Sequence, residues 1–289
     1  MNISCGSATA LEPKKLIQEA LDKQIQSKKL EIPLLPQVAS RLLALSSDPD
    51  ADAEKLSALI HQDQSLAGQV LRIANSPAYL PRTPIVSLQQ AVTWLGISLL
   101  TDLAFTVSIQ QRVFHVKGYE ADIKQLRQHS LASGVFGKEV ARLKRRNVEG
   151  AFLCGLLHSI GKPILLRTLA DLQRKLNVTL GLDDVCCFME AYHTLVGTMI
   201  AETWELPGMV RESIAYYDRY AQAQNFPDAV MITHLASRLA ATVFTPPKED
   251  VSDVWDDPVL EELNLYPDET TILLEKGEMV RETVESMLV

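Results

Sequence analysis

The sequence is poor in aromatic and in basic residues. Phe, Trp and Tyr together make up 6% of its 289 residues, and 36 Asp and Glu against 28 Lys and Arg give a formal net charge of −8. Proteins that bind nucleic acid through its phosphates need a basic surface. The acidic balance therefore argues against a nucleic-acid binder, although it is compatible with a local basic patch.

Cysteines and long apolar runs are also scarce. The four cysteines are Cys5, Cys154, Cys186 and Cys187, and none of them is paired at the spacing of a metal site. The last three lie in apolar runs, so we expect them to be reduced and buried rather than redox-active. The chain opens without the apolar core of a signal peptide, and no uninterrupted apolar run reaches about 18 residues. We expect a soluble, cytoplasmic protein with no membrane partner.

Helical periodicity, in contrast, is abundant. Hydrophobic residues make up 47% of the chain and charged residues 22%, which is an ordinary globular composition. Apolar residues recur every three or four positions, as in "PKKLIQEALDKQIQ", and no long stretch alternates with the period of a strand. Asp52 and Ser65 precede two such runs and are candidate N-cap residues. The pattern predicts an all-α fold.

Two breaks divide the predicted helices. Gly118, in "HVKGYE", interrupts two helical regions, and it predicts an N-terminal helical lobe over residues 1–117 and a second helical lobe over residues 118–289. The acidic, Pro-containing stretch "TPPKEDVSDVWDDP" is typical of a linker. We therefore expect the second lobe to end in a helical appendage from about residue 246.

Several segments resemble a known family. They are "IPLLPQVASRLLAL", "LRIANSPAY" and "QQAVTWLG" in the first half, and "GLLHSIGK" at residues 155–162 in the second. Together they resemble the HDOD family of bacterial signalling modules, which is related to the HD-type phosphohydrolases. The resemblance covers roughly residues 25 to 245 and implies a two-lobed helical bundle of HDOD type with an HD-like C-terminal lobe. One departure is Gln64, where the family usually has a proline.

The resemblance also implies a set of metal-site positions. HD-type hydrolases hold divalent ions with histidines and aspartates, and the ion makes a bound water nucleophilic. Three histidines match ligand positions: His129, His158 and His193. Four neutral residues stand where relatives carry aspartates or a histidine pair: Ser159, Ser237, Tyr216 and Tyr217. The resemblance therefore implies a degenerate metal site.

These replacements have a physical consequence. A serine hydroxyl is neutral and a weak ligand, so each exchange of aspartate for serine removes an anionic oxygen of the kind that Mg²⁺ or Mn²⁺ prefers. Changes around metal ligands already lower affinity by about 10–100-fold, and the loss of two ligands should lower it further. We therefore predict no catalytic residue in this lobe.

Two interpretations of His129, His158 and His193 stay open. Imidazoles alone suit Zn²⁺, Ni²⁺ or Fe²⁺, so the three could form a transition-metal site. Alternatively, they are core residues hydrogen-bonded to the neighbouring serine and tyrosines or to backbone carbonyls, as buried polar side chains usually are. We favour the second interpretation and expect no cofactor.

The favoured function is a non-catalytic signal-transduction module that acts through protein–protein contacts. The resemblance implies response regulators or cyclic-di-GMP enzymes as partners, and we expect them to act in trans because neither kind of domain is fused in this sequence. A candidate contact surface is the cleft between the two lobes, including the loop from Asn75 to Thr83 that carries Tyr79 and Leu80. Tyr79 could be an interface anchor or could pack onto its own lobe. As an anchor, Tyr79→Ala would weaken partner capture without altering thermal stability.

The alternative function is a metal-dependent phosphohydrolase or phosphodiesterase with an altered, histidine-rich site. Such an enzyme would need carboxylates from elsewhere, and Glu190 and Asp218 are the nearest in sequence. Glu190 lies three residues before His193, so the two share one face of a helix. Stoichiometric metal that is lost in a His158→Ala variant would favour this alternative.

The run "RLKRRN" at residues 142–147 is the main basic cluster. Its four basic side chains could bind an acidic partner or a phosphate. They could equally stabilise the C-terminal end of a helix through its dipole, and we favour this structural role.

Overall fold

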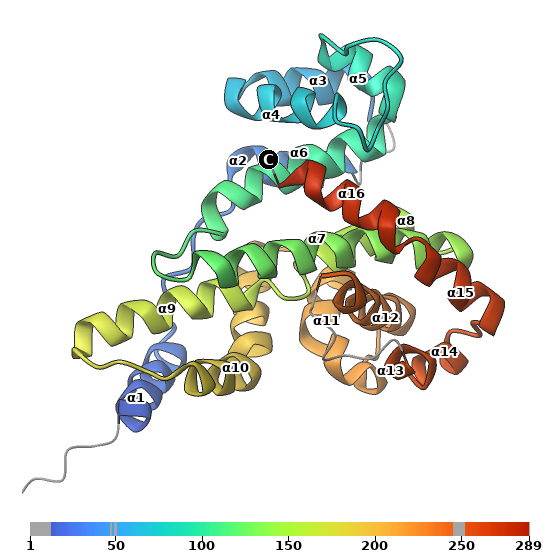
Figure 1. Ribbon diagram of the computed structural model, residues 1–289. Coiled ribbons are helices and arrows are strands. Elements are labelled where there is room, and N and C mark those ends of the chain that lie inside the picture. The colour runs from blue at the N-terminus through green and yellow to red at the C-terminus, as the bar shows by residue number, and fades with distance from the viewer. Residues whose placement is uncertain (1–12, 47, 49–50, 245–251, 289) are drawn as a thin grey trace, which may run out of the picture.

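The computed structural model describes residues 13–46, 48, 51–244 and 252–288 of the chain. Every regular element in this part is helical, so the all-α prediction is confirmed (Figure 1). Cys5 lies outside the described residues, and so do residues 245–251 of the predicted linker.

The elements follow one another with short connections. In chain order they are α1 (Pro13–Gln26), α2 (Gln37–Ser46), α3 (Ala53–His61), α4 (Gln64–Ala74), α5 (Leu88–Leu95), α6 (Ile97–Val113), α7 (Glu120–Leu143), α8 (Val148–Leu157), α9 (Gly161–Leu176), α10 (Leu182–Thr203), α11 (Gly208–Tyr216), the 3₁₀ helix η1 (Tyr217–Gln222), α12 (Pro227–Phe244), α13 (Ser252–Trp255), α14 (Val259–Glu262), α15 (Pro267–Glu275) and α16 (Gly277–Met287).

Side-chain caps fix where several of these helices begin. Asp52 accepts a hydrogen bond from the backbone N–H of Lys55 and caps α3, as predicted. The predicted cap Ser65 is wrong: Asp63, two residues earlier, accepts from the N–H of Leu66 and starts α4. Both residue types can cap a helix, and Asp63 has the extended backbone that a cap requires.

The front lobe consists of α2 to α6, with α6 in contact with α2, α4 and α5. The short helices α3, α4 and α5 gather at one end of the molecule in Figure 1. They turn apolar faces inward, and fully buried side chains include Leu56, Ile60 and Leu88. Burying a large aliphatic side chain stabilises a fold by roughly 1.5–3 kcal/mol, so this small lobe depends on these buried side chains.

The second lobe is built around α7, the longest helix. It packs against α8 and α12 along most of its length, while α9 packs against α10 (Figure 1). Helix α8 carries glycine where it crosses α7: a Cβ at Gly155 would overlap the carbonyl of Ser133. The absence of a side chain there lets the two backbones touch.

Helix α1 does not pack with the front lobe that precedes Gly118. It lies against α9 and α10 of the second lobe (Figure 1). Lys14 Nζ is 2.9 Å from Asp184 Oδ1, and the hydroxyl of Tyr192 donates to Asp22 over 2.8 Å. The described part of residues 1–117 is therefore divided in space, because α1 belongs to the other lobe's surface.

The C-terminal appendage folds back onto the second lobe, where α16 crosses α7 (Figure 1). Asp257, just after α13, accepts a hydrogen bond from His234 Nε2 on α12 over 2.9 Å.

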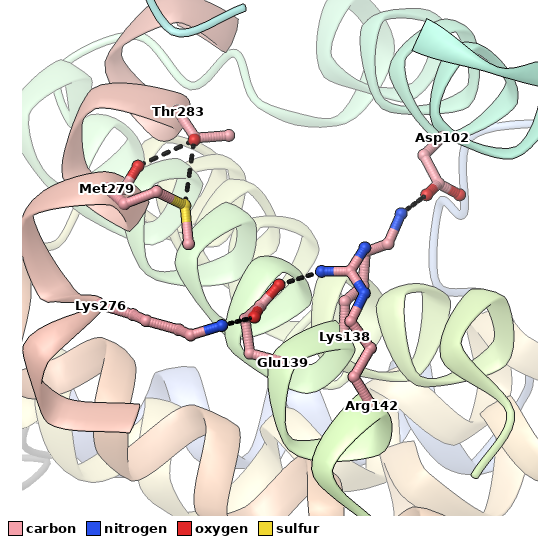
Figure 2. A network of polar contacts seen from close by, with 7 residues as sticks. All are labelled: Asp102, Lys138, Glu139, Arg142, Lys276, Met279 and Thr283. Carbon is pink, nitrogen blue, oxygen red and sulfur yellow. Dashed lines mark hydrogen bonds and ion pairs between the residues drawn. The ribbon is translucent and has the colours of Figure 1, made fainter. Parts of the chain in front are cut away.

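Figure 2 shows Glu139 of α7 paired with Lys276 at the start of α16 and with Arg142. Its neighbour Lys138 reaches Asp102 of α6 instead. Adjacent residues of α7 thus hold the appendage and the front lobe.

The basic run after α7 binds its own chain. Lys144 donates to the carbonyl of Asn264 over 2.8 Å, and Arg146 lies 2.9 Å from Asp228. Arg145 adopts a left-handed conformation with φ of 52°, which ends the helix. These contacts support a structural role for the run.

Two cysteine predictions are wrong. Cys154 is buried on α8 as expected, but Cys186 and Cys187 are exposed on α10. The reason is the helical period, because Val185 and Phe188, three positions apart, face the core and turn the cysteines between them outward.

One stretch has the length and hydropathy of a membrane span. It covers Val148–Leu176, that is, α8 and α9, and 89% of its apolar window is buried inside the protein. A helix in the core of a protein passes the same test, so this stretch is weak support for a membrane span.

Candidate functional site

The motif "GLLHSIGK" lies at the centre of the second lobe. Helix α8 ends at Leu157, His158 and Ser159 occupy the turn, and α9 begins at Gly161. A Cβ at Gly161 would overlap the carbonyl of His193 on α10, so glycine lets α9 start against that helix. The close approach buries His158 and Ser159, each of which is 1% exposed.

His158 uses one of its two ring nitrogens. Nδ1 lies 2.7 Å from the carbonyl oxygen of Gly155, so Nδ1 carries the proton and donates it. Nε2 is buried and has no hydrogen-bond partner among the described residues. The ring lies 5.4 Å from that of His129 and 4.6 Å, edge-on, from that of Tyr217. The turn therefore holds a neutral imidazole with an open lone pair.

His193 uses both nitrogens. Its Nδ1 lies 2.8 Å from the carbonyl oxygen of Met189 and donates to it, so Nε2 accepts from the hydroxyl of Tyr217 over 2.8 Å. Burial raises the pKa of Tyr217 above its usual range, which keeps the hydroxyl protonated as a donor. Tyr217 is one of the two tyrosines predicted here. Its hydroxyl binds the lone pair of His193 Nε2, which a metal would need as a ligand.

The two serines at the predicted aspartate positions bind different neighbours. Ser237 on α12 lies with its Oγ 3.1 Å from Nε2 of His129. Ser159 turns toward α7, and its Oγ is 3.0 Å from that of Ser130. Tyr216, the other tyrosine, is half-buried at the end of α11, and no contact joins it to the histidines in the described part of the chain. The predicted residues therefore converge except for Tyr216.

The histidines are neutral at pH 7. Burial lowers the pKa of His129 to about 4, with the charge of Lys162 adding to the effect. Burial also lowers the pKa of His158 well below its ordinary value, and it lowers that of His193. Each imidazole therefore serves as a neutral hydrogen-bonding group.

A hydrolytic divalent metal does not fit these residues. No group of three or more His, Cys, Asp or Glu side chains is arranged to hold an ion anywhere in the described ranges. Glu190 and Asp218, the carboxylates nearest in sequence, are exposed on the surface. Ser159 and Ser237, at the two predicted aspartate positions, are neutral and do not supply the negative oxygen ligands that Mg²⁺ or Mn²⁺ prefers.

The predicted contact loop contains three differently placed residues. Asn75 closes the loop: its Nδ2 donates to the carbonyls of Leu71 and Ile85, and its Oδ1 accepts from the N–H of Ile85. Tyr79 is half-buried against the core, with its hydroxyl buried. Leu80 is 74% exposed and has φ of 40°. Truncation of Tyr79 should therefore lower thermal stability, and Leu80 is the exposed residue.

Two further exposed apolar residues lie at α5, which is joined to this loop by a hydrogen bond. Trp94 on α5 is 47% exposed and donates its indole N–H to the carbonyl of Tyr79 over 3.1 Å. Val86 is 74% exposed, and its N–H donates to Gln90, one turn before Trp94. We call Leu80, Val86 and Trp94 the loop patch. Sequence reasoning missed Val86 and Trp94, although a tryptophan one helical turn after the polar Gln90 was a usable signal.

A cleft between the lobes forms a second candidate site. Its volume is about 470 Å³, and its walls come from α2 and α6 on one side and from the starts of α8 and α11 on the other. Among the described residues, three carboxylates line it: Asp48, Asp102 and Glu149. Sequence reasoning missed them, although Asp102 is the single charge in the apolar run "GISLLTDLAFTVSI".

The fold and the grouped histidines define an HD-like helical protein. The HDOD domain family model matches residues 32–220, which is more than half of the chain. The chain therefore belongs to the HDOD domain family, and the resemblance noted in its sequence is confirmed.

Solved structures share the fold. An HDOD domain protein with unknown function from Geobacter sulfurreducens has a TM-score of 0.71 at 23% identity and covers 95% of this chain and 97% of its own. A "Putative metal-dependent phosphohydrolase" from Shewanella amazonensis SB2B has a TM-score of 0.70 at 18% identity. The match covers 94% of this chain and 99% of that protein. A "Putative signal transduction protein" from Marinobacter aquaeolei VT8 has a TM-score of 0.70 at 22% identity. The match covers 98% of this chain and 68% of that protein. Identities this low show the fold alone.

Among curated proteins, an uncharacterized protein of Treponema pallidum (strain Nichols) is 24% identical over 201 residues. The match covers 65% of this chain and 38% of that protein, so the chain spans less than half of the relative's length.

Proposed function

We propose that the protein is a non-catalytic signal-transduction module that acts through protein–protein contacts, with an HD-type pocket that does not support hydrolysis. It carries an HDOD domain, and its structural relatives include proteins described as phosphohydrolase-like and as signalling proteins. The observation that carries the proposal is that the pocket's polar groups bind one another, His193 with Tyr217 and His129 with Ser237.

The electrostatics of the pocket support this proposal. An ion entering it would have to break the hydrogen bond between Tyr217 and His193, which contributes about 0.5–1.5 kcal/mol. It would also bring positive charge into a buried site where the three imidazoles are neutral. An uncompensated buried charge costs several kcal/mol, so binding a divalent cation here would be unfavourable.

The loop patch is the surface that best fits a protein contact. Interfaces commonly use aromatic and aliphatic anchors of the kind that Trp94 and Leu80 supply. The left-handed backbone of Leu80 costs roughly 1–2 kcal/mol relative to an ordinary conformation, and such strain is often kept where it serves recognition. Partners of the patch would be response regulators or cyclic-di-GMP enzymes, encountered in trans in the cytoplasm.

The metal content of the full chain tests the degenerate pocket. After gel filtration in the presence of Mn²⁺, elemental analysis should find far less than one metal per chain. Hydrolysis of a generic phosphodiester with added Mn²⁺ should not exceed that of His158→Ala. One equivalent of metal, retained by the wild type and lost in His158→Ala, would overturn the proposal.

Capture experiments test the contact surface. Leu80→Asp should abolish binding to a purified response regulator or cyclic-di-GMP enzyme that the wild type captures. Leu182→Asp is the matched control, because Leu182 is 76% exposed on α10, away from the patch. Equal loss in both variants would contradict a role for the loop patch.

One observation favours a second candidate, an altered metal-dependent phosphohydrolase. The Nε2 lone pair of His158 is buried and has no partner in the described part of the chain, and an imidazole lone pair is what a transition metal binds. The metal analysis above separates the two candidates.

A further inference from the structure

The cleft between the lobes differs in character from the histidine pocket. Its floor is apolar and includes Leu42 of α2, Phe105 of α6 and Leu153 of α8. Its volume of about 470 Å³ lies within the range of sites that hold small ligands or single anchoring side chains with their neighbours. The cleft is therefore large enough for an apolar group and its polar tip.

The charged groups lining this cleft are all of one sign. Asp102 comes from α6 in the front lobe, Glu149 from the first turn of α8, and Asp48 from the segment after α2. No Lys, Arg or His side chain of the described residues lines it. Lys138 binds Asp102 from α7, and Lys55 binds Asp48 over 3.6 Å, but neither is part of the lining.

Glu149 is the lining carboxylate that has no ion-pair partner among the described residues. It is exposed at the start of α8 and forms no ion pair with the described residues. The side chain of Asp102 is 6% exposed, and burial raises its pKa to about 6 although the paired Lys138 lowers it; the charge of Glu149 across the cleft adds to the rise. Lys138 pairs with Asp102 from behind the cleft, so a cation in the cleft would pair with Glu149 and would also reduce its repulsion of Asp102.

The combination of apolar floor and acidic rim selects a particular kind of cation. A hydrated metal ion gains nothing from Leu42 or Phe105, whereas an arginine or lysine side chain can lay its methylene stem on such a floor. Its charged tip can then reach the carboxylates, and a guanidinium can do so with two parallel hydrogen bonds.

We propose that the interlobe cleft binds an arginine or lysine side chain presented by a protein partner, with its stem on the apolar floor and its charge between Asp102 and Glu149. This inference rests on the proposed function, because it names the chemistry that a protein partner would offer. The side chain would contact both lobes at once, so its binding would also favour one relative orientation of the lobes.

A peptide pair tests the proposal on the full chain. One peptide carries a single arginine flanked by leucines, and the other replaces the arginine by citrulline, which has the same shape and no charge. Isothermal titration should show the arginine peptide binding at least tenfold more tightly than the citrulline peptide. Glu149→Gln should weaken the arginine peptide at least fivefold and leave the citrulline peptide unchanged.

Controls separate the cleft from nonspecific charge attraction. Glu202→Gln, which neutralises an exposed carboxylate of α10 outside the cleft, should leave both affinities unchanged. Equal affinity of the two peptides, no binding of either, or equal effects of Glu149→Gln and Glu202→Gln would overturn the inference. Agmatine, a free alkylguanidine, binding as tightly as the arginine peptide would assign the cleft to a small amine and would also overturn it.

Failure of this inference is distinct from failure of the proposed function. The metal analysis and the Leu80→Asp capture experiment do not involve the cleft. If both succeed while the peptides fail, the protein is still a non-catalytic contact module, but its partner does not use the cleft.

Discussion

The histidine pocket and the interlobe cleft differ in the polar groups that they contain and in how those groups are paired. In the pocket, neutral imidazoles, hydroxyls and a phenol bind one another, and Ser159 and Ser237 supply hydroxyls rather than carboxylates. In the cleft, carboxylates from both lobes face a cavity of about 470 Å³ over an apolar floor. The carboxylates that can attract a positive group therefore lie between the lobes, whereas the histidine pocket offers only neutral groups.

The largest expected effect is in the wall of the cleft. Lys138→Met leaves Asp102 buried without its partner, so the free energy of unfolding at pH 8 should fall by about 3–5 kcal/mol. The loss should be smaller at pH 5, because a proton on Asp102 removes the unpaired charge. Urea denaturation at the two pH values measures both effects.

A double variant provides the control for this pair. Asp102→Leu combined with Lys138→Met replaces both charges by apolar groups and should recover most of the lost stability. A loss below about 1 kcal/mol in Lys138→Met alone would contradict the importance of the pair.

The second prediction concerns pH and sets the two regions against each other. The folded-state pKa of His129 is about 4 against an ordinary value of 6.5, so the unfolded chain binds a proton that the folded chain does not between these values. Stability is fully present above pH 6.5 and falls on acidification, by up to about 1.4 kcal/mol per pH unit for each such histidine. His158 and His193 act in the same direction, because burial lowers their pKa too.

Asp102 opposes this trend. Its pKa is raised to about 6 from an ordinary 3.8, so the folded chain binds the extra proton between these values, and stability rises as the pH falls through them. His158→Gln should therefore reduce the decrease in stability that thermal denaturation measures as the pH falls from 7 to 4. Asp102→Asn should steepen it. The same slope in wild type and both variants would refute the assignment.

The third prediction concerns a variant that introduces two aspartates into the histidine pocket. Ser159→Asp combined with Ser237→Asp should lower the melting temperature in EDTA, because two carboxylates enter a buried neutral site. Mn²⁺ should return stability by about 1.4 kcal/mol for each tenfold excess over its dissociation constant. Ser213→Asp, at a fully buried serine of α11, is the matched control and should be destabilised without rescue by Mn²⁺. Equal behaviour of the two proteins would mean that more than two carboxylates are missing.

The smallest effect is expected at the loop patch. Leu80→Gly removes the strain of a left-handed leucine, so the free energy of unfolding should stay unchanged or rise by up to about 1 kcal/mol. Partner capture should still be lost, because the exposed anchor is gone. A parallel loss of stability and capture would instead make Leu80 a structural residue.

Helices and their buried faces were predictable from the sequence. Ile17 and Leu21 of α1 lie at helical spacing and are fully buried. The neighbour against which such a face packs was not predictable, because an apolar stripe fits any other stripe of similar width. Helix α1 therefore turned out to pack on α9 and α10 rather than on the front lobe.

The site was predictable only in part. Resemblance placed His129, His158 and His193 in one region, and the structure brings them together around Tyr217. Their hydrogen bonds to Met189 and Gly155 could not be predicted, because they depend on the backbone geometry of α8 and α10. Similarly, Asp102 and Glu149 are 47 positions apart in the sequence, and only the packing of the lobes brings them to one cavity.

The packing of α12 on α7 has a practical consequence for anyone who cuts this chain into pieces. The family match stops at residue 220, yet α12 begins at Pro227 and supplies Ser237, the neighbour of His129. A fragment trimmed at that match would expose the long apolar flank of α7 to water and invite self-association. Fusions and truncations should therefore carry α12 and the helices after it, as the smallest piece that retains a closed interior.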